Sequence, residues 1–197
     1  MVLLIDKYYN HRDILMTCIV GIVDRSFSTP RVLMGADSGA SDTELMTPIM
    51  DPKIQKNGRY LIGYAGETGL GQLFHVVDFP EPPQSHKELL KFMRTKFALA
   101  YKNAINLYSP STSPSDDKDG GVSALIAVRG RLFEFNSEDF QFNEYYECAI
   151  GSGAHFAFGS LFTTRGYKDN NRRLKLSIEA AIEYNPSCKG PIVYDYI

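Results

Sequence analysis

The sequence predicts one α+β domain in which two β-sheets pack face to face with helices on both outer sides, a four-layer α-β-β-α sandwich. Two observations carry this prediction. Short β-branched runs alternate along the 197-residue chain with pairs of helical stretches, in the order strands, two helices, strands, two helices, strand. Two such sets can stack sheet on sheet and leave their helices outside. The length also suits a single domain with a sizeable core.

The first set of strands is bounded by clear turn signals. The runs TCIVGIV and RVLMGA are rich in β-formers and are separated by SFSTP, which predicts a hairpin. Two further short runs flank Asn57-Gly58, a dipeptide typical of tight hairpin turns. The strands of this set are therefore expected at residues 17–23, 31–36, 52–55 and 59–65.

Helical spacing of apolar residues follows this set. The stretch 70–77 and the long stretch 85–109 are expected to form the first helix pair, with Ser85 as N-cap and Glu88 completing a capping box. The low-complexity segment 110–121 (PSTSPSDDKDGG) is expected to be an exposed loop. The later strands are expected at 122–130, 131–136, 145–151 and 191–197, and the second pair of helices at 152–164 and 172–184.

Composition excludes several classes of function. A formal net charge of −2 gives no electrostatic reason to bind nucleic acid or anionic membranes. The apolar patch VLLI near the start is too short for a signal peptide or a membrane span, and three cysteines form no disulfide or metal spacing. The four histidines show no ligand spacing, and GETGLG is not a dinucleotide fingerprint. We expect a cytoplasmic protein without metal or cofactor.

Thr17, followed directly by Cys18, is the first candidate for chemistry. A threonine hydroxyl is a weak nucleophile unless a nearby base takes its proton, and a free α-amino group on the same residue can be that base. This solution requires Thr17 to become the first residue of the chain. The alternative is a threonine chosen for its β-propensity at a strand edge.

Four other residues could support such a nucleophile, each with a simpler alternative. Asp37 follows a strand in MGADSGAS and could orient a lysine or form an Asx-turn; Lys53 could lower the cost of an alkoxide or be solvated. Gly63 could offer its N–H to an oxyanion or mark a bulge in its strand. Ser152 lies between glycines at a strand-to-helix junction and could face a site or cap the helix.

The order of these motifs resembles one family closely. The stretches MTCIVGIV, MGADSGAS, DPKI, LIGYAGE and AIGSGAHFAFGSL, spread over residues 16–162, resemble proteasome β-subunits and the peptidase subunit of the bacterial HslUV protease, within the N-terminal-nucleophile hydrolases. The resemblance is strongest to small proteasome-like proteins of bacteria and phages. It implies the same four-layer fold and a threonine peptidase without cofactors.

The resemblance also implies a role for each candidate. The nucleophile falls on Thr17, the aspartate on Asp37, the lysine on Lys53, the oxyanion glycine on Gly63 and the supporting serine on Ser152. It further implies a polypeptide substrate and assembly into homo-oligomeric rings. An ATP-dependent unfoldase is a partner that some members of this family use. Residues 17–197 would form the peptidase domain, and residues 1–16 would be a leader or propeptide. Either autoprocessing removes this segment, or translation begins at Met16 and that methionine is clipped.

Two departures from the family pattern keep an alternative open. The C-terminal segment EYNPSCKGPIV matches the family's supporting aspartate and serine only approximately, at Asn185 and Ser187, and Met16 stands where family propeptides often end in glycine. A non-catalytic structural or assembly component with a retained leader is therefore the second hypothesis. A third places the nucleophile at Cys18, but alternation along the strand would point this side chain to the opposite face from Thr17.

Overall fold

The computed structural model of the chain describes residues 17–41, 46–48, 50–108 and 121–197. The expected leader, 1–16, and nearly all of the expected loop, 110–121, lie outside these residues. The described residues form two main antiparallel sheets. One has the order β10 (Glu147–Ile150), β1 (Ile19–Asp24), β2 (Arg31–Ala36), β11 (Val193–Tyr196); the other has the order β5 (Ile54–Asn57), β6 (Tyr60–Gly66), β7 (Val122–Val128), β8 (Arg131–Asn136), β9 (Gln141–Tyr145).

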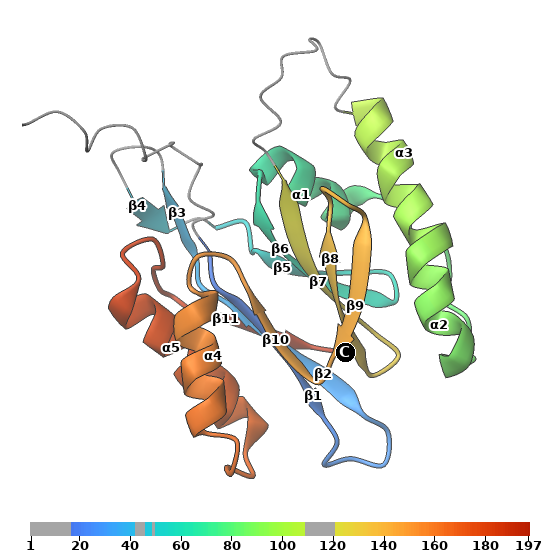
Figure 1. Cartoon of the computed structure of the whole chain (residues 1–197). Coiled ribbons are helices and arrows are strands. Elements are labelled where there is room, and N and C mark those ends of the chain that lie inside the picture. Colours follow the sequence, from blue (N-terminus) through green and yellow to red (C-terminus); the bar gives the residue numbers. More distant parts are fainter. Residues whose placement is uncertain (1–16, 42–45, 49, 109–120) are drawn as a thin grey trace, which may run out of the picture.

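Helices cover the outer face of each sheet, as Figure 1 shows. The five-stranded sheet is covered by one group of helices and the four-stranded sheet by another. The first group comprises α1 (Thr68–Val76) and a continuous helix made of α2 (His86–Phe92), the π-helical turn η1 (Met93–Phe97) and α3 (Ala98–Tyr108); the second comprises α4 (Ala154–Thr163) and α5 (Asn170–Tyr184). The predicted four-layer sandwich is confirmed.

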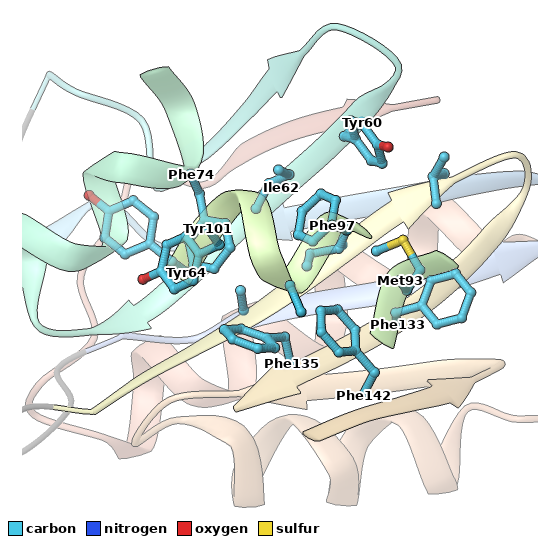
Figure 2. Close-up of a cluster of buried hydrophobic side chains, with 14 of the residues drawn as sticks. Tyr60, Ile62, Tyr64, Phe74, Met93, Phe97, Tyr101, Phe133, Phe135 and Phe142 are labelled. Atoms are coloured by element: carbon cyan, nitrogen blue, oxygen red, sulfur yellow. The ribbon is translucent and has the colours of Figure 1, made fainter. Parts of the chain in front are cut away.

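Three clusters of buried side chains fill the spaces between the layers. The cluster under α1 to α3 is mainly aromatic, and Figure 2 shows rings from the sheet and the helices packed together. Phe74 stacks on Tyr101 with ring centroids 4.0 Å apart, and both rings meet Phe135 edge to face. The second cluster lies between the sheets and the third under α4 and α5. Such burial is the main stabilising contribution to a domain of this size.

Strand β1 illustrates how alternation divides its side chains between two clusters. Cys18, Val20 and Ile22 pack in the cluster under α4 and α5, whereas Ile19 packs between the sheets. Gly21 lies on the inter-sheet side, where a Cβ would be 2.9 Å from the Leu132 side chain. The lack of a side chain at Gly21 therefore lets Leu132 of the other sheet pack directly against the middle of β1.

The structure departs from the expected elements in three places. Strand β9 was not expected: the expected strand 145–151 corresponds to β10, and only its first residue, Tyr145, belongs to β9, which lies in the other sheet. Between them the Tyr146 carbonyl accepts a hydrogen bond from Val23 N–H at 2.8 Å, which ties the crossing to β1. A short hairpin of β3 (Gly39–Ser41) and β4 (Met46–Pro48) was not expected. Ser85 is the N-cap of α2, but its side chain makes no capping hydrogen bond, so the predicted capping box is wrong.

Candidate active site

Asp37, the residue after β2, is the centre of a buried polar cluster. Its carboxylate is 1% exposed and accepts four hydrogen bonds. Oδ1 accepts from the backbone N–H of Cys18 at 2.9 Å and from Lys53 Nζ at 2.9 Å; Oδ2 accepts from the backbone N–H of Gly39 at 3.0 Å and of Lys189 at 3.1 Å. A buried carboxylate with this many donors is fully satisfied and rigidly held.

Lys53 brings the second charge to this cluster. It precedes β5, its side chain is 6% exposed, and it forms an ion pair with Asp37. The pair lies sixteen residues apart in sequence, and both members are buried. A buried ammonium held by a carboxylate can stabilise negative charge that develops nearby, because water screens it little.

Thr17 is attached to the same cluster through the backbone. The Cys18 N–H that bonds Asp37 belongs to the peptide group whose carbonyl is that of Thr17. That carbonyl accepts from Gly153 N–H at 3.1 Å. Gly151 has a φ of +87°, and a Cβ there would be 2.1 Å from the Thr17 oxygen. Only glycine allows this approach, so the Gly151–Gly153 turn fixes the position of Thr17.

Ser152, inside this turn, belongs to a second set of polar groups. Asn185 Nδ2 donates to Ser152 Oγ at 3.0 Å, and Asn185 Oδ1 accepts from Ser187 N–H at 2.9 Å. Because a backbone N–H can bond only the amide oxygen, this second bond fixes which end of the Asn185 amide faces Ser152. The Ser152 hydroxyl therefore accepts from Asn185, and its own hydrogen bonds to the Cys188 side chain.

Cys188 is the residue of this region that sequence reasoning missed. Burial raises the pKa of its thiol to about 12; the Asp37 carboxylate also raises it, while Lys53 and a side-chain hydrogen bond with Ser152 lower it. The Cys188 side chain therefore lies among the candidates, whereas Ser187 contributes its backbone N–H to Asn185. The signal was the pattern N-P-S-C, in which the cysteine, and not the serine, follows Asn185 by three residues.

Gly63 is not brought to the cluster. It lies in the middle of β6, opposite Ile54 on β5 and Leu125 on β7. Tyr64 N–H donates to the Lys53 carbonyl, which makes Ile54 and Gly63 a non-hydrogen-bonded pair and directs the Gly63 N–H to Leu125. A Cβ on Gly63 would be 2.7 Å from the Ile54 side chain and 3.0 Å from that of Ile19 on the facing sheet, so this glycine serves close packing between the sheets.

Gly66, three residues further on, has the orientation that Gly63 lacks. Glu67 N–H donates to the Gly121 carbonyl, so the alternation of the ladder turns the Gly66 N–H away from β7. The Gly66 N–H therefore points to the β5 side of β6, beyond the first residue of β5 and toward the edge where Lys53 lies. Its φ of +122° suits glycine alone, a signal that the turn residues G-E-T-G after the strand could have given.

The Cys18 thiol packs in the cluster under α4 and α5. It is fully buried under α4 and α5, beside Cys188 and Ala181. Burial raises the pKa of its thiol, nearby Cys188 and Asp37 raise it further, and Lys53 opposes them. A buried, protonated thiol is a poor nucleophile.

Residues 17–41, 46–48, 50–108 and 121–197 contain no group of three or more His, Cys, Asp or Glu side chains placed to hold a metal ion. None of their helices combines the length and apolar character that crossing a membrane requires.

Comparisons with known proteins identify the fold. No family model matches the sequence, and no curated protein matches it. Thiobacillus denitrificans BPH in complex with epoxomicin superimposes with a TM-score of 0.71 at 15% identity, over 91% of this chain and 97% of the other. BPH alone gives 0.69 at 17% identity, over 91% and 97% of the two chains. Eukaryotic HslV from Trypanosoma brucei gives 0.62 at 15% identity, over 91% and 98%. This chain has the fold of the HslV-type and BPH-type proteins, the proteasome-like N-terminal-nucleophile fold.

Proposed function

We propose that this chain is a threonine-type peptidase of the proteasome-like kind, which cleaves peptide bonds with Thr17 once the α-amino group of Thr17 is exposed. One observation carries the proposal. The buried carboxylate of Asp37 holds the ammonium of Lys53 and the backbone next to Thr17 at the same time. A hydroxyl, a fixed buried cation and a potential amine are thereby assembled at one point of a fold shared with such proteins.

The chemistry follows from these groups. The Thr17 Oγ attacks the peptide carbonyl carbon while its proton passes to the α-amino group of the same residue. Lys53 stabilises the negative charge on the attacking oxygen, and Asp37 keeps Lys53 in place and charged. The C–N bond then breaks, the leaving amine takes the proton, and an ester remains on Thr17. Water, deprotonated by the same amine, hydrolyses the ester and restores the hydroxyl.

The oxyanion of the tetrahedral intermediate needs an N–H donor. The Gly63 N–H is directed into the β6–β7 ladder, so we propose Gly66 in its place, since its N–H points to the edge where Lys53 lies. Ser152, whose hydroxyl accepts from Asn185 and is hydrogen-bonded to the Cys188 side chain, stabilises the turn whose Gly153 N–H holds the Thr17 carbonyl. In this scheme Ser152 and Asn185 position groups and form no covalent bond with the substrate.

The mechanism requires that residues 1–16 be absent from the active chain. Autoprocessing could remove them, or translation could begin at Met16, with that methionine clipped because the next residue is small. The associated proposals are a polypeptide substrate, a cytoplasmic location, assembly of several copies and an unfoldase partner. No cofactor enters any step.

The deciding experiment combines mass spectrometry of the native N-terminus with hydrolysis of fluorogenic peptides. We expect the mature chain to begin at Thr17 and Thr17→Ala to lower hydrolysis by at least about a thousandfold. Thr17→Ser keeps a hydroxyl and an amine and should retain measurable activity. Cys18→Ala should remain active, because that side chain packs on the other side of β1. An active chain that retains residues 1–16 would exclude this mechanism.

The alternative is a structural or assembly component with the same fold and a retained leader. A chain beginning at Thr17 that hydrolyses no peptide or amide would favour this alternative. Loss of hydrolysis in Thr17→Ala, with unchanged thermal stability, would exclude it.

A further inference from the structure

The end of the sandwich farthest from Thr17 is rich in arginine. It is formed by the β1–β2, β5–β6 and β7–β8 turns and by the crossing from β9 to β10. Figure 1 shows β1 and β2 extending to their turn at this end. Thr17 precedes β1 and Arg25 follows it, so about 26 Å of extended chain separates the two residues. This end is therefore separate from the candidate active site.

Positive charge is in excess at this end. Four of its arginines share three carboxylates: Asp24 pairs with Arg31, Glu81 with Arg59 and Arg129, and Glu144 with Arg131. The fifth, Arg25, has no carboxylate partner among the residues that the structure describes, and its guanidinium carbon lies 4.0 Å from the ring centroid of Tyr146. The chain as a whole has a net charge of −2, so this excess is local. Such a concentration of charge favours an anionic ligand.

A cavity of about 220 Å³ opens here between residues of both sheets. Its lining includes Arg25 and Pro30 from the β1–β2 turn and Gly130 and Arg131 from the β7–β8 hairpin. The two turns touch, since a Cβ on Gly130 would be 2.3 Å from the Pro30 carbonyl oxygen. An engineered cavity of about 150 Å³ is known to hold benzene. This cavity therefore has room for a ring and one small substituent, in contact with both sheets.

Arg131 is held in place at the cavity wall. Its Nε and Nη2 donate to the Glu144 carboxylate, and its Nη1 donates to the His86 carbonyl at 2.5 Å. A guanidinium group has five N–H donors, so two of them have no acceptor in these contacts. The side chain is only 19% exposed. Arg131 therefore offers fixed donors to a ligand at little entropic cost.

Arg25 offers a second guanidinium group, with every donor free of hydrogen bonds to the described residues. Its contact with the Tyr146 ring restrains the side chain but uses no N–H, because a ring face attracts the cation without accepting a directed hydrogen bond from each nitrogen. The imidazole of His86, which also lines the cavity, adds one more donor. The wall therefore presents more donors than acceptors.

The donors and the apolar walls together indicate the class of ligand. A phosphate monoester carries a charge of about −1.5 to −2 and three acceptor oxygens, which suits two guanidinium groups. A carboxylate suits them less, because it has one charge and two oxygens and because Glu144 already occupies that place on Arg131. Val23, Pro30 and Tyr145 give the rest of the wall an apolar and aromatic character that suits a ring.

We propose that this cavity is a binding site for a small organic phosphate that carries an aromatic ring. The phosphate lies between Arg25 and Arg131, and the ring packs against Val23 and Pro30. The inference goes beyond the proposed function and does not depend on the peptidase mechanism. Because the ligand contacts both sheets of the folded chain, its binding should also stabilise the fold.

Calorimetry with phenyl phosphate as the probe tests the site in the whole chain. The wild type should bind one molecule per chain, and Arg25→Gln should weaken binding by about tenfold to a hundredfold, because charge-assisted hydrogen bonds are lost. The matched control is Arg165→Gln, since Arg165 is also exposed and also lies on a ring, 4.6 Å from the centroid of Phe162. This control should bind phenyl phosphate as the wild type does.

Thermal melting gives a second readout. At about 100 times its dissociation constant, phenyl phosphate should raise the melting temperature of the wild type by about 5–10 °C. At the same concentration Arg25→Gln should show about half this shift or less, because its affinity is at least about tenfold lower. Without ligand the variant should melt close to the wild type, since Arg25 is exposed.

Three further probes separate the parts of the ligand. Inorganic phosphate lacks the ring, benzoate has a carboxylate in place of the phosphate, and phenol lacks the anion. Each should bind at least about tenfold more weakly than phenyl phosphate. The inference is overturned if phenyl phosphate does not bind, if Arg25→Gln binds it as tightly as the wild type, or if any of the three probes matches its affinity.

Thr17→Ala distinguishes this inference from the proposed function. The variant should lose peptide hydrolysis and still bind phenyl phosphate as tightly as the wild type. Loss of binding in Thr17→Ala would place the phosphate at the candidate active site and contradict the inference. A wild type that binds phenyl phosphate but hydrolyses no peptide would contradict the proposed function alone.

Discussion

Replacing Lys53 by methionine tests whether the Asp37–Lys53 pair organises the candidate site. Methionine keeps much of the aliphatic volume but removes the ammonium, which lies 2.9 Å from Asp37 and is 6% exposed. Removing one partner of a buried pair leaves an uncompensated charge and costs about 3–5 kcal/mol. Asp37 would keep three backbone N–H donors. We therefore expect a loss near the lower end, about 3 kcal/mol.

The assay is thermal and urea unfolding of the variant beside a matched control. For a domain of this size, 1 kcal/mol shifts the melting temperature by about 2–4 °C, so Lys53→Met should lower it by about 6–12 °C. Lys56→Met is the control, because Lys56 pairs with Asp195 at 2.7 Å but is 49% exposed. An exposed pair contributes about 0–1 kcal/mol, so the control should shift the melting temperature by a few degrees at most.

A double-mutant cycle separates the pair from its surroundings. Asp37→Asn combined with Lys53→Met removes both charges, so the double variant should be less destabilised than the sum of the two single variants. If Lys53→Met costs no more than Lys56→Met, or if the two single effects simply add, the pair does not hold the site together and the reasoning fails.

Three further predictions concern the turn at Thr17, the acid limit of stability and the buried thiols. Gly151→Ala should abolish peptide hydrolysis and lower stability by at least about 1–2 kcal/mol through its left-handed backbone alone, because a Cβ would overlap the carbonyl that it faces; Gly166→Ala, with open space around it, should be neutral in both assays. Burial raises the pKa of Asp24, but hydrogen bonds from neighbouring groups lower it by a larger amount. The folded pKa of Asp24 therefore lies below the ordinary value of 3.8. Its stabilisation is therefore complete above this value and lost as pH falls through the folded pKa, so urea midpoints measured down to about pH 2 should depend less on pH in Asp24→Asn. Burial raises the pKa of the thiols of Cys148 and Cys188 to about 12, so a disulfide reagent should label them only as fast as the chain unfolds, and rapid labelling of the native protein would contradict this burial.

The four layers were predictable because they depend on periodicity and order. Period-two runs bounded by turn residues gave the strands β1, β2, β6, β7 and β8, and helical spacing gave the helices on both sides. What periodicity does not contain is the partner of each strand. The run 145–151 reads as one strand, yet its two ends pair with different sheets, with Leu132 opposite Tyr145 and Ile22 opposite Glu147. Tertiary pairing decided the break at Tyr146, and local propensity did not.

The candidate site was predictable to the extent that it depends on side chains next to strand ends. Asp37 and Lys53 each flank a strand end, and the structure joins them directly. Gly63 was assigned from the resemblance and not from its orientation. The hydrogen-bonding direction of a strand residue alternates, and only the register shows that the Gly63 N–H points to β7 whereas the Gly66 N–H does not. Register requires knowledge of the partner strand, which a single sequence does not provide.

The loop after α5 shows a different limit. Asn185 is the C-cap of the helix, and Pro186 prevents the helix from continuing. Cys188 N–H bonds back to the Asn185 carbonyl, and this turn buries Cys188 while Ser187 stays half-exposed. The resemblance matched Ser187 only approximately to the family's supporting serine. The backbone turn, which carries no periodicity, selects the thiol instead.

The doublet of Thr17 and Cys18 joins these levels. Cys18 takes part in the site through its backbone, since its N–H bonds Asp37 while its thiol is buried on the opposite side of β1. Any side chain that packs under α4 and α5 could therefore hold Thr17 in place equally well. The identity of residue 18 should matter for stability alone, whereas residue 17 must keep a hydroxyl. In the proposed mechanism, the peptide group between residues 17 and 18 is anchored to Asp37, and the rigid sheet thereby positions the Thr17 hydroxyl just before β1.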